Sequence, residues 1–117
     1  MYRYDIDKYQ ETCSETAVYP EARCIEYLTL GLTSEAGEVA GKIKKLIRDR
    51  DKGLEVNAAL SFIDKEDIIS EMGDVLWYIA MLAWELDYNL SDVAYYNVEK
   101  LQDRKQRGTL KGSGDKR

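Results

Sequence analysis

The sequence predicts an all-α fold in a single domain, on three observations. Apolar residues recur at three- and four-residue intervals along several stretches, which is the period of an α-helix. The 117 residues contain one proline, and their β-branched and aromatic residues do not alternate with polar ones as they would in strands. The length suits one domain with a modest core. We therefore expect one four-helix domain over residues 1–108 and a flexible tail over residues 109–117.

The first two predicted helices are separated by Pro20, which stops the first of them after Tyr19. The first helix covers residues 5–18, and Asp5 or Asp7 is placed to cap its N-terminus. The apolar side of this helix consists of Ile6, Tyr9, Cys13 and Ala17.

Two glutamates interrupt the apolar side of the second helix, predicted over residues 21–47. Its apolar row is Ile25, Leu28, Leu32, Val39, Ile43 and Leu46. Glu35 takes a position of this row that calls for an apolar residue, and Glu38 lies one turn further along. A carboxylate is almost never buried unless it is paired or bound to metal; the alternative is a solvated helix edge. Gly37 and Gly41 each lower helix propensity by about 1 kcal/mol. Their presence therefore predicts that another helix or a ligand approaches this helix closely.

A second pair of carboxylates occurs on the third helix, predicted over residues 64–87 after a loop over residues 48–64. Its core face is Ile68, Met72, Val75, Ile79, Leu82 and Leu86. Glu71, Asp74 and Tyr78 lie on a row beside that face. Each carboxylate pair therefore projects from one side of a helix, one turn apart. The sequence indicates no chemical role for this loop.

Packed face to face, these two helices would bring four carboxylates together. Two unit charges about 4 Å apart repel by roughly 4 kcal/mol at an effective dielectric of about 20, whereas a domain is stable by only about 5–15 kcal/mol. The cluster therefore needs a cation or shared protons. Because the chain has no histidine and two cysteines, the ligands are oxygens, which suits Mg²⁺ or Mn²⁺ and argues against zinc. A di-iron site, which uses Glu-x-x-His pairs, is the weakest alternative.

The fourth helix, predicted over residues 90–107, carries a cationic strip. Asn89 and Asp92 have the spacing of a capping box at its start. Asn97 takes a position in its apolar row, so we expect it to have a hydrogen-bond partner inside the fold. The basic residues that follow at three- and four-residue steps are Lys100, Arg104 and Arg107. Such a strip can neutralise phosphate oxygens without reading a base.

The charge is distributed unevenly along the chain. Residues 1–99 carry 20 acidic and 10 basic side chains, whereas residues 100–117 carry 2 acidic and 7 basic ones. The acidic body could hold a metal and the basic end a phosphate; a solvated basic tail is the alternative. The few basic residues do not resemble a nucleic-acid-binding surface. The longest apolar run, residues 75–84, is too short to cross a bilayer, and the N-terminus has no apolar signal region. We expect a cytoplasmic protein without nucleic-acid or membrane partners.

Together these motifs resemble the MazG-like all-α nucleoside triphosphate pyrophosphohydrolases. The resemblance covers nearly the whole chain. It rests on Tyr9-Gln10, Thr16-Ala17 and Tyr19-Pro20, on LTSEAGEVAGKIKK (residues 32–45), on EMGDVLWY (residues 71–78), and on NVEKLQDRKQRG followed by GSGD (residues 97–115). The four carboxylates followed by the Asn-Lys-Arg helix form a specific signature, whereas either half alone is weak.

The resemblance implies Mg²⁺-dependent hydrolysis of a (deoxy)nucleoside triphosphate between the α- and β-phosphates, giving monophosphate and pyrophosphate. By position, the implied metal ligands are Glu35, Glu38, Glu71 and Asp74. Either Glu35 or Glu38 would orient or deprotonate the attacking water. The implied substrate-contacting residues of the last helix are Asn97, Lys100 and Arg104. Tyr78 could stack on a nucleobase, although packing is the simpler role for an aromatic residue on a bundle helix.

One position departs from the family pattern. Ser34 stands where the pattern has its first glutamate, which bears on the number of metals and on the rate. A helical sensor or binding module that holds nucleotide and metal but hardly turns over is therefore the alternative function. The resemblance also implies a homo-oligomer, a dimer or a dimer of dimers, with the substrate near the subunit boundary.

Overall fold

The computed structural model describes residues 3–50 and 60–117, and over these residues the chain is helical without a strand. The all-α prediction is confirmed. In chain order the elements are α1 (Ile6–Cys13), a 3₁₀ turn (Ser14–Thr16), a second 3₁₀ turn (Glu21–Arg23), α2 (Cys24–Arg50), α4 (Phe62–Glu85) and α5 (Leu90–Arg107).

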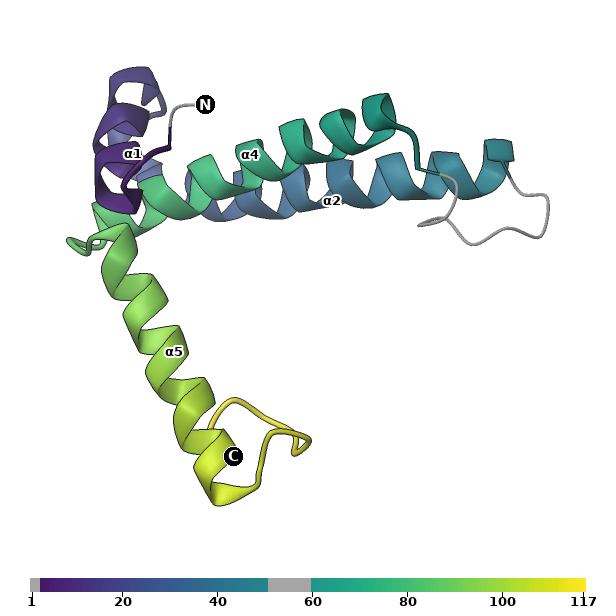
Figure 1. The fold of residues 1–117 in the computed structure, drawn as a ribbon. Coiled ribbons are helices and arrows are strands. Elements are labelled where there is room, and N and C mark those ends of the chain that lie inside the picture. The colour runs from purple at the N-terminus through teal and green to yellow at the C-terminus, as the bar shows by residue number, and fades with distance from the viewer. Residues whose placement is uncertain (1–2, 51–59) are drawn as a thin grey trace.

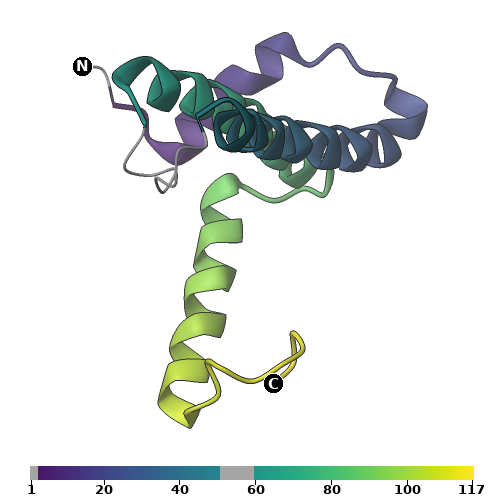
Figure 2. The same ribbon diagram turned by 90° about the vertical axis from the view of Figure 1, so that its right-hand side faces the viewer.

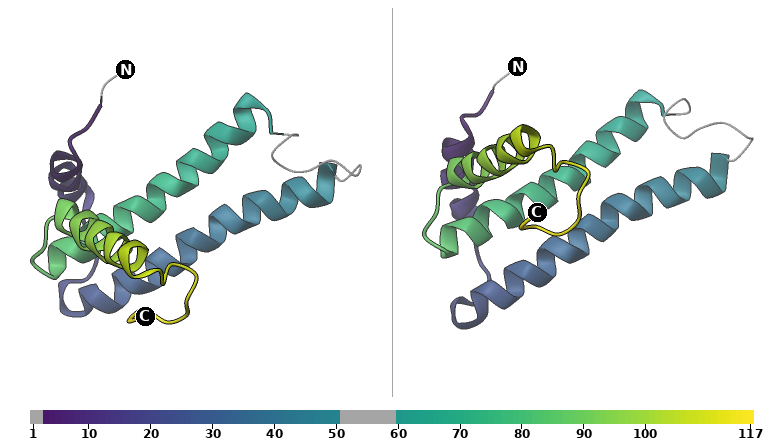
Figure 3. Two further views of the ribbon diagram at one scale, coloured as in Figure 1. Left: turned by 60° about the horizontal axis from the view of Figure 1, so that its bottom comes forward. Right: turned by 90° about the horizontal axis from the view of Figure 1, so that it is seen from below.

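The two longest helices, α2 and α4, form an antiparallel pair that runs side by side (Figures 1 and 3). α1 packs against α4 at the end of this pair where α2 begins and α4 ends. α5 leaves from the same end and points away from the pair, as Figures 1 and 2 both show. The single chain is therefore a packed unit of α1, α2 and α4 from which α5 projects.

The helix ends follow from local hydrogen bonds. Asp5 caps α1 by accepting hydrogen bonds from the backbone N–H groups of the residues two and three positions later. Ser61 caps α4 and forms a capping box with Asp64, so this helix begins at Phe62 rather than at residue 64. Gly108 ends α5 in the left-handed conformation, with φ of 71°, as its position in the sequence predicts.

Three predicted boundaries are displaced. The first helix ends at Cys13 and continues only as a 3₁₀ turn, and a 3₁₀ turn also precedes α2. α2 extends to Arg50, because the lysines and arginines of its last turns are good helix formers. The loop predicted over residues 48–64 is therefore helical at both of its ends, and its middle, residues 51–59, lies outside the described residues.

The core lies where the starts of α2 and α5 meet α1 and the end of α4, around Leu28, Met81 and Leu90. Gln10 is 2 % exposed in this core, and both the nitrogen and the oxygen of its side-chain amide form hydrogen bonds. Its Nε2 donates to the carbonyls of Ala80 and Tyr88 at 3.0 and 3.1 Å, and its Oε1 accepts from the N–H of Leu90 at 3.0 Å. One buried side chain thus fastens α1 to the corner between α4 and α5.

A second contact fixes the start of α5. The carboxylate of Asp7 accepts hydrogen bonds from the backbone N–H and the hydroxyl of Ser91, at 2.8 and 2.6 Å. Beyond this first turn, the side chains of α5 are exposed apart from Arg104. The direction of α5 is therefore set at its N-terminal end.

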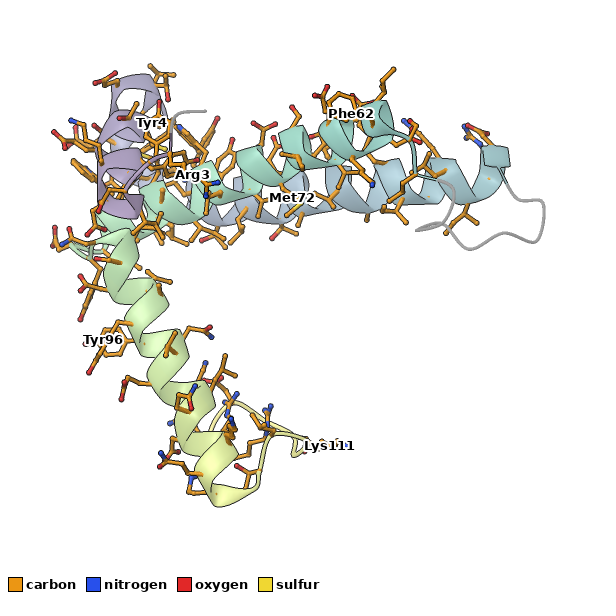
Figure 4. All side chains as sticks on the ribbon, viewed as in Figure 1. Arg3, Tyr4, Phe62, Met72, Tyr96 and Lys111 are labelled. Atoms are coloured by element: carbon orange, nitrogen blue, oxygen red, sulfur yellow. The ribbon has the colours of Figure 1, made fainter. Side chains whose placement is uncertain are left out.

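Several apolar side chains lie outside the core. Met72 and Leu86, predicted to be core residues, are each 54 % exposed. Met72 on α4 and Tyr96 on α5 are labelled in Figure 4. Other exposed apolar residues of these two helices are Ile69, Leu76, Tyr95, Val98 and Leu101. The predicted apolar rows are present, but a single chain covers only part of each. Among the described helices, none combines the length and apolar character that a bilayer span requires.

Candidate active site

Three of the predicted carboxylates meet between α2 and α4. Glu35 lies in the middle of α2, and Glu71 and Asp74 lie one turn apart on α4. One carboxylate oxygen from each lies within 4.8 Å of the other two. We call these three residues the acidic cluster. It is formed by the packing of two helices that are far apart in sequence.

The electrostatics of the cluster favour a bound cation. Glu35 is half-buried, and its pKa is raised first by this burial and then by the negative charges of Asp74, Glu71 and Glu38. Ionising Glu35 therefore costs more free energy than ionising an isolated glutamate, and a nearby positive charge would offset this cost. Opposite ligands of one Mg²⁺ are about 4.2 Å apart, so the observed spacing needs little adjustment to bind a single ion.

Glu38, the fourth predicted ligand, is not part of this group. It is exposed, one turn beyond Glu35 on α2, although its charge still contributes to the raised pKa of Glu35. The helical spacing places both glutamates on the same side of α2, but only Glu35 faces α4 closely enough to join the two α4 carboxylates.

A cavity of about 380 Å³ adjoins the acidic cluster. It is lined by Glu35, Asp74, Trp77, Tyr78 and Thr16. The indole N–H of Trp77 donates a hydrogen bond to the hydroxyl of Thr16 at 2.9 Å, which connects the 3₁₀ turn after α1 to α4. Two carboxylates of the acidic cluster therefore form part of the wall of a cavity whose other walls include two aromatic rings.

The position of Tyr78 depends on a glycine that the sequence analysis missed. A Cβ atom at Gly31 would lie 2.1 Å from Cε1 of Tyr78, so the ring fits only because residue 31 has no side chain. Burial first, then a hydrogen bond with Tyr27, raises the pKa of the Tyr78 hydroxyl. The sequence predicted close neighbours at Gly37 and Gly41 instead, where a Cβ would meet nothing within 4 Å among the described residues.

The predicted substrate residues on α5 are separated from the acidic cluster within one chain, since α5 points away from the α2–α4 pair (Figure 1). Asn97 is exposed, and its side chain makes no hydrogen bond among the described residues. Asn97 and Lys100 instead line a cavity of about 700 Å³ at the corner of α4 and α5, together with Tyr88 and Tyr96.

Lys100 and Arg104 are occupied by the segment that follows α5. The Nζ of Lys100 donates to Oδ1 of Asp115 at 2.8 Å. The Nη2 of Arg104 donates to the same oxygen at 3.1 Å and also to the backbone carbonyl of Asp115. Arg104 is 5 % exposed. The sequence analysis did not identify Asp115 as a partner, because a separation of 11 to 15 residues across a turn follows no helical period. The flexibility predicted for residues 109–117 stays a prediction.

A known domain family matches most of the chain. The MazG nucleotide pyrophosphohydrolase domain matches residues 24–109, which include the acidic cluster and α5. The Gene 37 protein of Mycobacterium phage L5 is 44 % identical over 118 aligned residues, covering 96 % of this chain and 98 % of that protein. The uncharacterized protein YvdC of Bacillus subtilis (strain 168) is 37 % identical over 73 residues, covering 62 % of this chain and 68 % of that protein. No solved structure gives a significant match. Because the domain match extends over more than half of the chain, the chain belongs to the MazG nucleotide pyrophosphohydrolase domain family.

Proposed function

We propose that this protein hydrolyses (deoxy)nucleoside triphosphates between the α- and β-phosphates with the help of Mg²⁺, or alternatively Mn²⁺. The observation that carries the proposal is the acidic cluster: three carboxylates from two helices, with one half-buried member whose pKa is raised, beside a cavity lined by aromatic rings. Membership of the pyrophosphohydrolase family supplies the reaction class. The oxygen-only donor set fits Mg²⁺.

Glu35, Glu71 and Asp74 would hold the ion. When bound, Mg²⁺ withdraws negative charge from the phosphate oxygens in the transition state. Glu38 is exposed and one turn away from the cluster, so it is the carboxylate best placed to accept a proton from the attacking water. The water oxygen bonds to the α-phosphorus, the bond from that phosphorus to the oxygen bridging it to the β-phosphorus breaks, and pyrophosphate leaves.

Tyr78, Trp77 and Thr16 would contact the nucleoside part of the substrate. All three line the cavity that shares Glu35 and Asp74 with the acidic cluster. A nucleotide whose phosphates lie near those carboxylates would therefore place its remaining groups against the aromatic walls. Stacking of a base on an aromatic ring is tolerant of base identity, so these residues support binding rather than a particular base preference.

We infer that Asn97, Lys100 and Arg104 meet the phosphates through a second copy of the chain. Within one chain α5 points away from the acidic cluster. An apolar groove of about 550 Å³ lies between α2 and α4 and is lined by apolar residues of both helices. Its walls include Ala36, Val39, Ile69, Met72, Gly73, Val75, Leu76 and Ile79. Such a surface favours burial against another chain, in a dimer or a dimer of dimers.

The decisive experiment is a product-resolved assay. Each canonical dNTP is incubated with the protein and Mg²⁺, and the products are separated by anion-exchange chromatography. We expect nucleoside monophosphate and pyrophosphate in equal amounts, no reaction with EDTA, and a rate at least about 10²-fold lower for Glu38→Gln. Glu66→Gln, which removes an equal charge from an exposed site on α4, should keep the wild-type rate. Intact substrate, or inorganic phosphate without pyrophosphate, would refute the proposed bond cleavage.

The second candidate function is a nucleotide and metal sensor with little turnover. Ser34, exposed on α2 next to Glu35, supports it because a hydroxyl cannot supply the charge of the glutamate that the family pattern has there. Tight nucleotide binding without product would favour the sensor. Ser34→Glu should then raise the rate, whereas an unchanged rate would show that residue 34 does not limit turnover.

A further inference from the structure

The segment after α5 folds back along the helix that it follows. Gly108 and Gly114, with φ of 71° and 83°, allow the chain to reverse direction. The guanidinium of Arg117 then donates to the carbonyls of Thr109 and Gly114 at 3.0 and 2.6 Å. Figures 1 and 2 show this returning segment in yellow beside the end of α5. We call residues 109–117 the returning tail.

The tail ends over the cations that the proposed function assigns to phosphate. A single oxygen, Oδ1 of Asp115, accepts hydrogen bonds from both Lys100 and Arg104, at 2.8 and 3.1 Å. These hydrogen bonds and charges hold the pKa of Asp115 below its usual value, so the group is ionised at neutral pH. A carboxylate oxygen shared by a lysine and an arginine is in the same chemical environment as an oxygen of a bound phosphate.

The exposure of the three side chains indicates which of them a ligand can reach. The side chain of Asp115 is 76 % exposed and that of Lys100 is 42 % exposed, whereas that of Arg104 is 6 % exposed. An incoming anion can therefore contact Lys100 directly, but it can reach Arg104 only after Asp115 moves. As long as the tail is in place, one of the two cations is unavailable.

We propose that the Asp115 carboxylate occupies the phosphate position on Lys100 and Arg104, so that the returning tail competes with polyphosphate ligands and is displaced when they bind. This inference rests on the proposed function, since it takes Lys100 and Arg104 as phosphate-binding groups. It adds that the tail regulates access to them. The tail acts as an internal competitor that lowers the apparent affinity without changing the chemical step.

The expected strength of this competition is modest. Exposed ion pairs are weak, and a polyphosphate offers several oxygens and more charge than one carboxylate. Apparent affinity falls in proportion to the fraction of molecules in which the site is free. With the strength of the exposed Lys100–Asp115 pair, the closed tail would weaken polyphosphate binding roughly two- to sixfold. An effect of this size tunes the affinity and still allows the ligand to displace the tail.

The first test measures binding of inorganic tripolyphosphate by titration calorimetry, because this ligand reports on phosphate binding without nucleotide hydrolysis. Asp115→Asn should bind it about two- to sixfold more tightly than the wild type. The matched control is Asp103→Asn, which removes the same charge from the same end of α5 but pairs with Arg107. The control should bind as the wild type does. Weaker or unchanged binding by Asp115→Asn, equal gains in both variants, or no binding at all would overturn the proposal.

The second test follows the tail itself. Lys111 is exposed within the returning tail and is labelled in Figure 4, so trypsin cleavage after this residue reports on tail release. Tripolyphosphate should accelerate that cleavage in the wild type and have a smaller effect in Asp115→Asn, whose tail has lost the carboxylate that competes for the two cations. Protection by tripolyphosphate would overturn the proposal and show that the tail closes over the ligand. Competition without any dNTP turnover would instead refute the hydrolase function alone.

Discussion

The acidic cluster and the basic end of α5 differ in how the fold holds their charges. The carboxylates of Glu35, Glu71 and Asp74 are brought together by two helices packed along their length, so three acidic groups lie close to one another. The cations Lys100 and Arg104 lie on α5, a helix that is held mainly at its start. Both form ion pairs with Asp115 of the tail.

This difference separates a preorganised site from an adjustable one. Moving the members of the acidic cluster apart would disturb the packing of α2 against α4, so an added cation would relieve their repulsion at a lower cost than rearrangement. The α5 cations can exchange one anion for another at little cost, because their present partner is largely exposed. Four predictions test this contrast, in decreasing order of expected effect.

Removing a charge from the acidic cluster should have the largest effect. Glu71→Gln should lower kcat/KM for a dNTP by roughly 10³-fold, because it removes a ligand of the proposed ion. Without metal, the same variant should unfold at a higher temperature than the wild type, since one repulsive charge is lost. Asp67→Asn, an exposed site one turn earlier on α4, is the control for both measurements. A fully active Glu71→Gln variant would eliminate the cluster as a metal site.

Gln10→Leu should destabilise the whole chain. The substitution leaves the carbonyls of Ala80 and Tyr88 and the N–H of Leu90 without their buried partner, at a cost of about 3 kcal/mol or more. Urea unfolding followed by circular dichroism measures the loss. Gln106→Leu, at an exposed position of α5, should leave the stability within about 0.5 kcal/mol of the wild type. Equal stability of the two variants would mean that Gln10 does not hold the start of α5.

Gly31→Ala should destabilise the chain by about 1–3 kcal/mol, because the added methyl group would overlap the ring of Tyr78 and force it to move. Gly41→Ala lies on the same helix in open space, so in a single chain it should stabilise α2 by about 1 kcal/mol. Thermal unfolding of the two variants shows whether each is less or more stable than the wild type. Destabilisation by Gly41→Ala as well would indicate that a second copy packs closely at that position.

Lys100→Gln should have the smallest effect on catalysis. We expect KM for a dNTP to rise about tenfold with kcat changed less, because an exposed lysine contributes to phosphate binding more than to the chemical step. Steady-state kinetics at two salt concentrations should also show a weaker salt dependence. Lys105→Gln, five residues further on the same helix and exposed, serves as the control. A loss in kcat alone would place Lys100 in the reaction itself.

Some elements of the fold and of the candidate site could be predicted from the sequence, and others could not. The apolar periodicity was sufficient for the long helices. Glu35 in an apolar position, together with the second acidic pair Glu71 and Asp74, predicted the three carboxylates that lie together in the structure. Helix ends were less predictable, since the Ser61 cap and the 3₁₀ turn at Ser14–Thr16 depend on local geometry that residue type alone does not specify. Asn97 was expected to have a hydrogen-bond partner inside and is exposed, because beyond its first turn α5 projects away from the other described helices.

Charge pattern, helical period and family resemblance can be determined from the sequence alone, because side chains three or four residues apart share a helix face whatever surrounds them. They were enough for the helical class, for the pairing of acidic turns and for the basic strip. The fit of Tyr78 over Gly31, the separation of Glu38 from the other three carboxylates, and the contact of Asp115 with Lys100 and Arg104 required the folded chain. Each of these depends on how segments distant in sequence approach one another, which packing and chain reversal decide and local spacing does not.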